Sequence, residues 1–252
     1  MKKFILLLSA IVALSLNAQV NYEDYFTNNT LRFDYNRCGT ATSEQVSFVQ
    51  MKQEGKWSGP RQHLIDPYTW GEYRVELYDK ATKKLIYSRG YAGLYSEWQS
   101  TAEAKLTSRC FYETALVPFP KKPATLQLYS RDRKTKLVKA FEYQIDPVNY
   151  FISKENGPTY KSYMVHDSGD PASKIDVVFL PDGFTASEMD KFSEAVKSFS
   201  KGLLETAPFA AAADKFNCWL VEAPSLESGT DVPGKGIYKN TLLSTGFYTF
   251  DS

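Results

Sequence analysis

Residues 175–208 limit most strongly what this chain can fold into, because they join a strand pattern to a helix pattern across one tight turn. Residues 175–180 are a short apolar and β-branched run, and the Pro181-Asp182-Gly183 sequence behind them is typical of a turn. Apolar residues then recur at helical spacing, which predicts a helix over residues 186–205. The predicted apolar face of this helix comprises Met189, Phe192, Val196, Phe199 and Leu203. We expect the strand and the helix to pack together in a sheet-containing domain, since each must bury its apolar face.

The two ends of the predicted helix carry their own local signals. Thr185 can cap the helix, and Glu188 three residues later completes a capping box. Phe184 and Met189 have the spacing of a hydrophobic staple, and Pro208 closes the segment. Capping and apolar spacing therefore predict the same helix.

The chain before Pro147 has the pattern of an all-β domain. Short alternating segments separated by polar turns have the spacing of a β-sandwich. These segments are residues 30–35, 44–53, 73–78, 84–89, 111–117, 125–129 and 136–145. Residues 97–105 are consistent with either a short helix or an extended crossover, with Trp98 as the anchor. We predict a β-sandwich over residues 19–150 and a domain boundary between Pro147 and Tyr160.

The N-terminus has the pattern of a secretory signal peptide. Lys2 and Lys3 precede an apolar run over residues 4–16 that is too short to span a bilayer, and Ala18 precedes Gln19. We predict that residues 1–18 are removed and that the protein is secreted or exported, to the periplasm or the cell exterior. No membrane span is expected.

The net charge bears on which partners the chain can bind, and the cysteines bear on whether it contains a disulfide. The chain has 30 Lys and Arg residues against 29 Asp and Glu residues, so its net charge gives no reason to expect nucleic acid or anionic lipid as a partner. Cys38 and Cys110 fall in the same predicted domain and can form a disulfide, but buried free thiols are equally consistent with the sequence. Cys218 lies in an apolar strand pattern, which favours a buried thiol over a nucleophile.

Motifs in both halves of the chain resemble those of one protein family. In the second half they are residues 167–172 (Asp-Ser-Gly-Asp-Pro-Ala), 174–185, 205–209 and 215–231. In the first half they are residues 97–104 (Glu-Trp-Gln-Ser-Thr-Ala-Glu-Ala), 109–113, 118–121, 131–132 and 145–147. Together these segments resemble the N-terminal domain and the start of the catalytic domain of immunoglobulin A peptidase-type zinc metallopeptidases.

This resemblance implies peptide-bond hydrolysis in a protein or peptide substrate, with zinc as the cofactor of the complete protein. It also implies that residues 160–252 are the opening part of an α/β, zincin-like catalytic domain. The His-Glu-x-x-His helix on which such zinc sites are built is absent from residues 1–252, whose only histidines are His63 and His166. We therefore assign no catalytic residue, metal ligand or cofactor-binding residue to this chain, and we interpret it as a truncated precursor that is inactive alone.

Several residues whose side chains could act in catalysis or metal binding are better explained by structural roles. Asp182 follows a strand but precedes Gly183, which is ordinary turn chemistry. His166 neighbours Asp167 and Asp170 without a second ligand at usable spacing, and His63 is a weaker candidate still. The remaining carboxylates, Glu222, Glu227 and Asp231, fit no calcium-loop spacing, and Ser168 and Ser228 lack a nucleophile frame.

Two other function classes remain open. The first is a non-catalytic, secreted β-sandwich module that binds glycan or protein, which exposed aromatic clusters around Trp57, Trp70 and Trp98 would favour. The second is a nucleotide-binding protein, suggested only by residues 229–235. That segment fits a phosphate loop until Gly236 replaces the required hydroxyl residue, and Pro233 removes a backbone donor.

Overall fold

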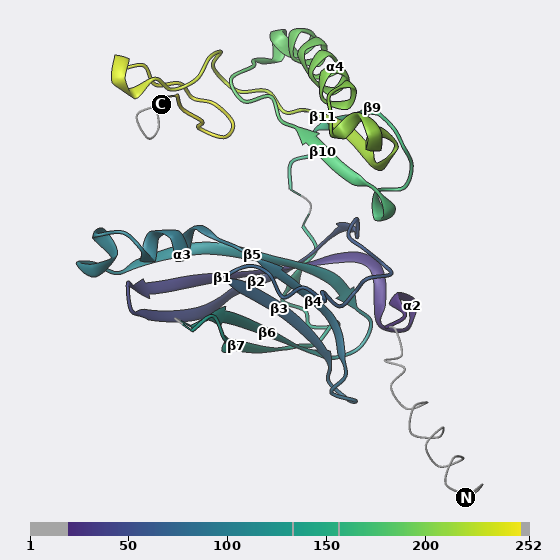
Figure 1. Cartoon of the computed structure of the whole chain (residues 1–252), viewed down its shortest axis with the longest axis vertical. Helices are drawn as coiled ribbons and strands as arrows, with labels where there is room; N and C mark the ends of the chain where they lie inside the picture. Colours follow the sequence, from purple (N-terminus) through teal and green to yellow (C-terminus); the bar gives the residue numbers. More distant parts are fainter. Residues whose placement is uncertain (1–19, 133, 156, 248–252) are drawn as a thin grey trace, which may run out of the picture. The chain divides into compact units, whose positions relative to one another are not determined.

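The computed structural model describes residues 20–132, 134–155 and 157–247, and the chain divides into two compact units between Glu155 and Asn156 (Figure 1). The division lies within residues 147–160. The predicted signal peptide, residues 1–18, lies outside the described residues. None of the helices among the described residues is both long enough and apolar enough to cross a bilayer.

Among the described residues, the first unit starts with a short helix, α2 (Tyr22–Tyr25), and contains two four-stranded sheets. One sheet has the order β5-β1-β2-β8 and consists of β1 (Phe26–Thr40), β2 (Ser43–Lys56), β5 (Arg109–Pro120) and β8 (Ile152–Ser153). Long antiparallel ladders join β1 to both β2 and β5. The short strand β8 pairs in parallel with β2, so residues after Pro147 still belong to this sheet, which the sequence pattern did not indicate.

The other sheet of the first unit is entirely antiparallel. Its order is β4-β3-β6-β7, with β3 (Tyr73–Asp79), β4 (Leu85–Tyr91), β6 (Ala124–Arg131) and β7 (Leu137–Ile145). Between β4 and β5 the chain forms a helix, α3 (Leu94–Gln99), and a 3-10 turn, η1 (Glu103–Lys105), so the helical alternative for this region is the one observed. Trp98 is buried there, as predicted for an anchor.

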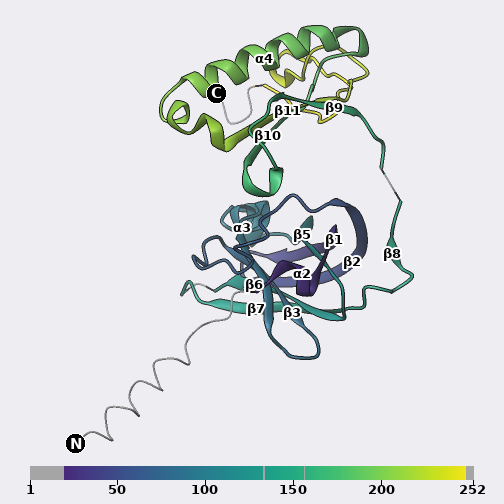
Figure 2. The same ribbon diagram turned by 90° about the vertical axis from the view of Figure 1, so that its right-hand side faces the viewer.

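The two sheets of the first unit lie one above the other in Figure 2. Their buried side chains form one hydrophobic core. Phe33 of β1 contacts Tyr143 of β7 with a ring-centroid distance of 5.4 Å. The apolar side chains that are completely buried alternate along the strands, as expected for sheets with one inward face. They include Leu31, Phe33, Val117, Leu77, Leu126 and Leu128. All seven predicted strand segments overlap observed strands, and several observed strands are longer.

The second unit is a small mixed sheet covered by one long helix. Its strand order is β10-β11-β9, with β9 (Lys161–His166), β10 (Ile175–Phe179) and β11 (Phe216–Glu222). Strands β10 and β11 are parallel, whereas β9 is antiparallel to β11. The crossover between β10 and β11 contains η3 (Ala186–Glu188), α4 (Met189–Glu205) and η4 (Phe209–Lys215). Two further 3-10 turns are η2 (Pro171–Ser173) and η5 (Pro233–Lys235).

The start of the α4 segment has the predicted capping chemistry. The Glu188 carboxylate accepts hydrogen bonds from the backbone N–H and the hydroxyl of Thr185, both at 2.9 Å. The Phe184 ring packs on Phe192, with centroids 5.2 Å apart, one helical turn beyond the predicted staple partner Met189. The capping box therefore forms, and the aromatic contact before it is shifted along the helix.

The apolar face predicted for α4 is wrong at Phe199, whose side chain is 61% exposed. Phe192 and Val196 pack on Leu220 of β11, and the small side chains of Ser193 and Ser200 are buried beside them. A sheet of three strands covers only a narrow stripe of the helix, so the outer part of the predicted face remains in solvent. Phe199 makes an edge contact with Phe179 of the edge strand, at 5.7 Å between centroids.

Candidate functional site

A pocket of about 440 Å³ lies beyond the carboxyl end of β10, where the turn of residues 181–183 leads into η3. Functional groups often occupy this position in α/β units. The turn, the start of the helix and two later loop segments line the pocket. Its lining residues are Asp182, Gly183, Phe184, Glu188, Lys191, Ser228, Gly229, Thr230, Thr245, Gly246 and Phe247.

Asp182 connects the turn to the segment of residues 241–245. Its carboxylate accepts hydrogen bonds from the backbone N–H groups of Leu243 at 2.8 Å and Thr245 at 3.1 Å. The hydroxyls of Thr241 and Thr245 also donate to it. Desolvation acts to raise the pKa of Asp182, but these four donors outweigh it and hold the pKa below its usual value. The Asp182 carboxylate is therefore ionised, and it holds the segment of residues 241–245 against the turn.

Two glycines bring the turn and the later loop together. Gly183 has a φ of 76°, and its carbonyl accepts a 2.9 Å hydrogen bond from the N–H of Gly229. A Cβ atom at Gly183 would lie 2.2 Å from the carbonyl oxygen of Gly229, so only glycine fits this approach. The Gly183 N–H donates to the Ser225 hydroxyl at 2.9 Å. The sequence Asp182-Gly183 thus supplies both the loop anchor and the space for the loop.

The two carboxylates of the pocket are poorly suited to proton transfer. Hydrogen bonds from the backbone and hydroxyl of Thr185, and from the Ser228 hydroxyl, lower the pKa of Glu188. An efficient general acid or base needs a pKa near the working pH, whereas Asp182 and Glu188 are both shifted away from neutrality. Lys191 contributes a cation whose ammonium lies 5.9 Å from the centroid of the Phe184 ring. The pocket therefore offers a polar binding recess rather than an acid–base pair.

His166 joins a local hydrogen-bond network at the end of β9. Its Nε2 atom lies 3.2 Å from the carbonyl oxygen of Ala213 and 3.1 Å from the Ser168 hydroxyl. Asp167 accepts from the N–H of Gly169, and the Asp170 carboxylate caps η2 through the N–H of Ala172. These two carboxylates stabilise turns, and His166 itself is half-buried.

The glycine-rich residues 228–236 form an irregular loop. Strand β11 ends at Glu222, and the loop contains the 3-10 turn η5 together with a bridge between Val232 and Ile237. The Asp231 carboxylate accepts from the backbone N–H of Lys239, and that of Glu227 accepts from the N–H of Asn240. A phosphate loop needs a strand leading into it and a helix leaving it, so this loop does not have that architecture.

The two halves of the chain match two models of one peptidase family. The Peptidase M64 N-terminus model matches residues 21–142, and the IgA Peptidase M64 model matches residues 164–252. The chain belongs to the M64 peptidase family. The resemblance detected in its motifs is thereby confirmed. No curated protein matches the M64 chain.

Membership of the M64 family implies a relation to zinc metallopeptidases. The residues that the structure describes do not form a zinc site. No three His, Cys, Asp or Glu side chains gather within that part of the chain in a way that could hold a metal. The two histidines, His63 and His166, belong to different units. Cys38 and Cys110 form a disulfide, which decides the pairing that the sequence left open, and Cys218 is a buried free thiol. No catalytic step is therefore assigned to these residues.

The M64 chain also contains a buried charged cluster that the sequence analysis missed. Arg37 is completely buried; its guanidinium donates to Glu113 at 2.9 Å and to the Ser130 hydroxyl at 2.8 Å, and it also pairs with Glu44. Its carbon Cζ lies 3.8 Å from the centroid of the Tyr73 ring. Alternation offered a signal, because Arg37 continues the period of the inward-facing residues of β1. Negatively charged partners on the neighbouring strands, Glu44 and Glu113, compensate this buried positive charge.

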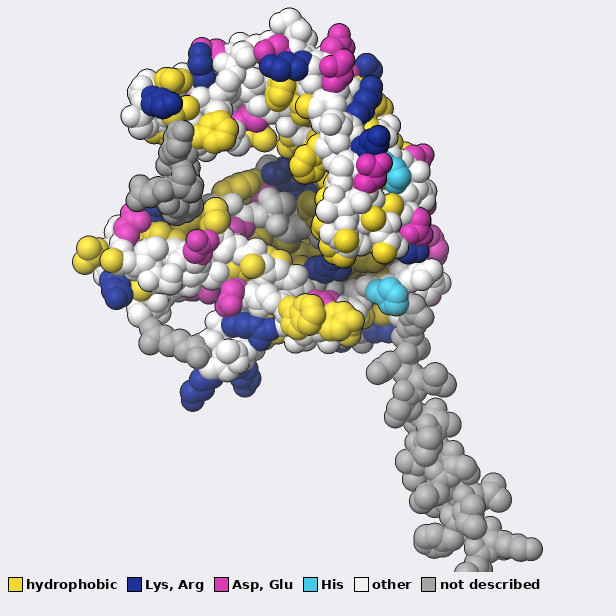
Figure 3. All heavy atoms as spheres, turned by 45° about the horizontal axis from the view of Figure 1, so that its top comes forward, with side chains coloured by type: hydrophobic (Ala, Val, Ile, Leu, Met, Phe, Trp, Pro, Cys, Tyr) yellow, Lys and Arg dark blue, Asp and Glu magenta, His cyan; other side chains and the backbone are white. Residues whose placement is uncertain are grey.

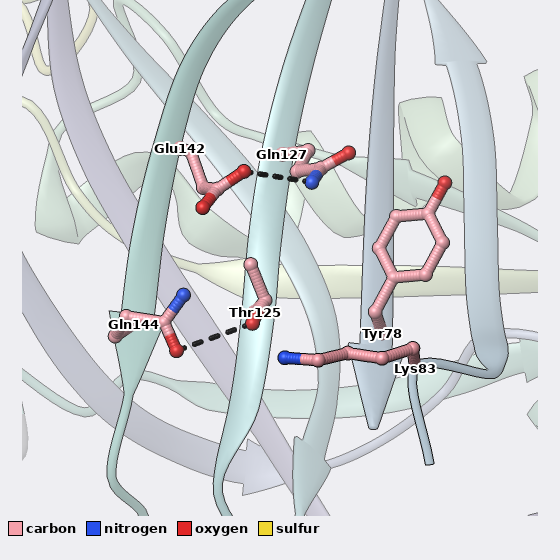
Figure 4. Close-up of a pocket in the computed structure, with 6 residues that line it drawn as sticks. All are labelled: Tyr78, Lys83, Thr125, Gln127, Glu142 and Gln144. Atoms are coloured by element: carbon pink, nitrogen blue, oxygen red, sulfur yellow. Dashed lines mark hydrogen bonds between the residues drawn. The ribbon is translucent and has the colours of Figure 1, made fainter. Parts of the chain in front are cut away.

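A second pocket of the M64 chain, of about 370 Å³, lies on the outer face of the β4-β3-β6-β7 sheet (Figure 4). The Gln127 amide donates to Glu142 at 2.8 Å, and the Thr125 hydroxyl donates to Gln144 at 3.2 Å. Lys83 and Tyr78 complete the lining. Polar side chains bonded to one another across strands are typical of the solvated face of an antiparallel sheet, so this pocket has an adequate structural explanation.

Proposed function

We propose that this chain is the N-terminal portion of a secreted zinc metallopeptidase that hydrolyses peptide bonds in a protein or peptide substrate. The two family matches support the proposal, since they occur in one chain over residues 21–142 and 164–252. The proposal divides the chain into a signal peptide at 1–18, a β-sandwich domain at 19–150 and the opening of a zincin-like catalytic domain at 160–252.

In this proposal the zinc ligands and the general base lie outside residues 1–252. The second unit then acts as a scaffold for the catalytic domain: α4 packs on β11, and Asp182 anchors the loop beyond β10. None of the described side chains is required to hold zinc. Basic and acidic side chains are interspersed over the described surface that Figure 3 shows, so charge of one sign does not dominate there.

Zinc content and proteolysis of two purified proteins test the proposal. One protein ends at Ser252, and the other continues through the residues that its gene encodes downstream. We expect the longer protein to bind one zinc ion and to cleave labelled casein, and the shorter one to do neither. Tight one-to-one zinc binding by the shorter protein would overturn the assignment of the ligands, and a longer protein without chelator-sensitive cleavage would overturn the peptidase.

The alternative function, a binding module, keeps one of its three aromatic candidates. Trp57 and Trp98 are buried, so the clusters around these two residues do not favour it. Trp70 is 74% exposed and is therefore available to a ligand. Binding by the first unit is compatible with peptidase activity elsewhere in the protein.

A further inference from the structure

Tyr68 and Trp70 stack on each other at the surface of the first unit, with ring centroids 4.9 Å apart and ring planes at 27°. Tyr68 is 65% exposed and Trp70 is 74% exposed, so this pair, which we call the aromatic platform, is largely in water apart from the ring faces that cover each other. Large aromatic side chains are usually at least half covered, because their burial stabilises the fold. Two of them exposed together indicate a surface kept for contact with another molecule.

The loop that carries the aromatic platform is held at several points. The Arg131 guanidinium donates to the carbonyl oxygens of Gly71, at 2.6 Å, and of Thr69. On the other side, the Asp66 carboxylate accepts from the N–H of Tyr68 at 2.9 Å and from the N–H of Gly90 at 2.9 Å. These bonds flank both aromatic residues, so the loop has a defined conformation although it contains no regular secondary structure.

The backbone between the two rings adopts a conformation that costs free energy. Thr69 has a φ of 54°, a value uncommon for a β-branched residue. Gly71 has a φ of 94°, and a Cβ atom there would lie 2.3 Å from the carbonyl oxygen of Tyr91. Strain of this kind persists where surrounding contacts impose it, and it is concentrated at binding sites. A pre-ordered loop also loses less conformational entropy when a ligand binds.

The size of the aromatic platform fits a small ligand. A fully packed aromatic side chain buries roughly 150 to 250 Å², and the two stacked rings present less than that each, whereas a stable protein interface buries about 800 Å² on each partner. The loop residues around the rings, Pro67, Thr69 and Glu72, are exposed and mostly polar. A folded protein would find too little apolar surface in this loop to form a stable interface.

We propose that Tyr68 and Trp70 bind an oligosaccharide of β-linked pyranose units. The face of an aromatic ring carries partial negative charge, which attracts the positively polarised C–H groups on the flat face of such a sugar. Sugar hydroxyls can then hydrogen-bond to water and to the polar residues of the loop. A proline-rich peptide instead docks in grooves between aromatic side chains, and stacked rings leave no groove between them.

Titration calorimetry on the full chain tests this site with cellohexaose, with the hexasaccharide of N-acetylglucosamine and with decaproline as probes. We expect at least one saccharide to bind, and Trp70→Ala and Tyr68→Ala each to weaken its binding at least tenfold. Tyr150→Ala is the matched control, since Tyr150 is 92% exposed and its described ring contact is with Phe151 rather than with either ring of the platform. Its affinity should equal that of the unsubstituted chain.

Three outcomes would overturn the proposal: binding of neither saccharide, binding of decaproline alone, or an equal loss of affinity in Tyr150→Ala. Arg131→Lys tests the role of the anchors, because lysine cannot bond to both loop carbonyls with a planar fork. This positioning variant should weaken saccharide binding and lower the protection of the loop amides from hydrogen exchange. Both aromatic residues are exposed, so unchanged unfolding midpoints will separate lost binding from lost folding. The result is independent of zinc content and proteolysis.

Discussion

The Nε atom of Arg37 lies 2.9 Å from Oε2 of Glu113, with the arginine side chain completely buried and that of the glutamate only 12% exposed. Tyr35 and Glu113 are cross-strand partners, so the ladder between β1 and β5 places the carboxylate beside the inward row that contains Arg37. A buried ion pair is weak evidence for net stability, but removal of one partner leaves an uncompensated buried charge.

We therefore predict that Arg37→Met destabilises the first unit by about 3 to 5 kcal/mol. The matched control is Arg109→Met on β5, where the arginine is 56% exposed and lies 3.2 Å from Glu103. An exposed pair of this kind contributes about 0 to 1 kcal/mol. Urea-dependent hydrogen exchange, read on peptides from the first unit, measures both effects. Equal losses in the two variants would show that the Arg37 cluster is not buried in solution.

The helix α4 offers two phenylalanines for a comparison within one element. Phe192→Ala should destabilise the second unit by about 3 to 5 kcal/mol, because this ring is buried against Leu220 and Phe184. Phe199→Ala should cost at most about 1 kcal/mol, since Phe199 is mostly exposed and retains only the edge contact with Phe179. Chemical denaturation of the second unit measures the difference. A larger loss at Phe199 would restore the helix face predicted from the sequence.

Asp182→Asn should release the segment of residues 241–245. The amide N–H groups of Leu243 and Thr245 lose a charged acceptor, so we expect their hydrogen exchange to accelerate by roughly tenfold to a hundredfold. Asp167→Asn is the control, because this exposed carboxylate accepts only from the N–H of Gly169 among the bonds described. Unchanged exchange at Leu243 in Asp182→Asn would contradict the anchoring role.

The same contact predicts a pH dependence. The pKa of Asp182 in the folded state is lowered, whereas an unfolded aspartate has a pKa of about 3.9. The contribution of Asp182 to stability is therefore fully present above about pH 4 and is lost as the pH falls through the folded pKa. In Asp182→Asn this loss should be missing from the acid unfolding curve of the second unit, whereas Asp167→Asn should retain it.

The cysteine pairing predicts a simple labelling result. After unfolding without reductant, alkylation followed by mass spectrometry should modify only Cys218, because Cys38 and Cys110 are bonded to each other. Prior reduction should expose all three thiols. Replacing both bonded cysteines by alanine should destabilise the first unit by about 2 to 4 kcal/mol, since the bond closes a long loop between β1 and β5. Three labelled thiols in the unreduced chain would exclude the disulfide.

Local sequence determined the strand, turn and helix of residues 175–205 and the alternating strands of the first unit. These features depend on capping, turn chemistry and apolar period within a few residues of one another, so they can be read along the chain. Family membership also came from the sequence, because its motifs are short and contiguous. The absence of a His-Glu-x-x-His helix from residues 1–252 is likewise a property of the sequence.

Tertiary structure decided what depends on residues far apart in the chain. The disulfide requires the register that places Cys38 opposite Cys110, and the Asp182 anchor requires donors about sixty positions away. The exposure of Phe199 reflects the width of the sheet beneath α4, and the platform of Tyr68 and Trp70 depends on Arg131 at the end of β6. Local propensity contains no information on register, sheet width or loop contacts, because their free energies arise only when separate elements pack together.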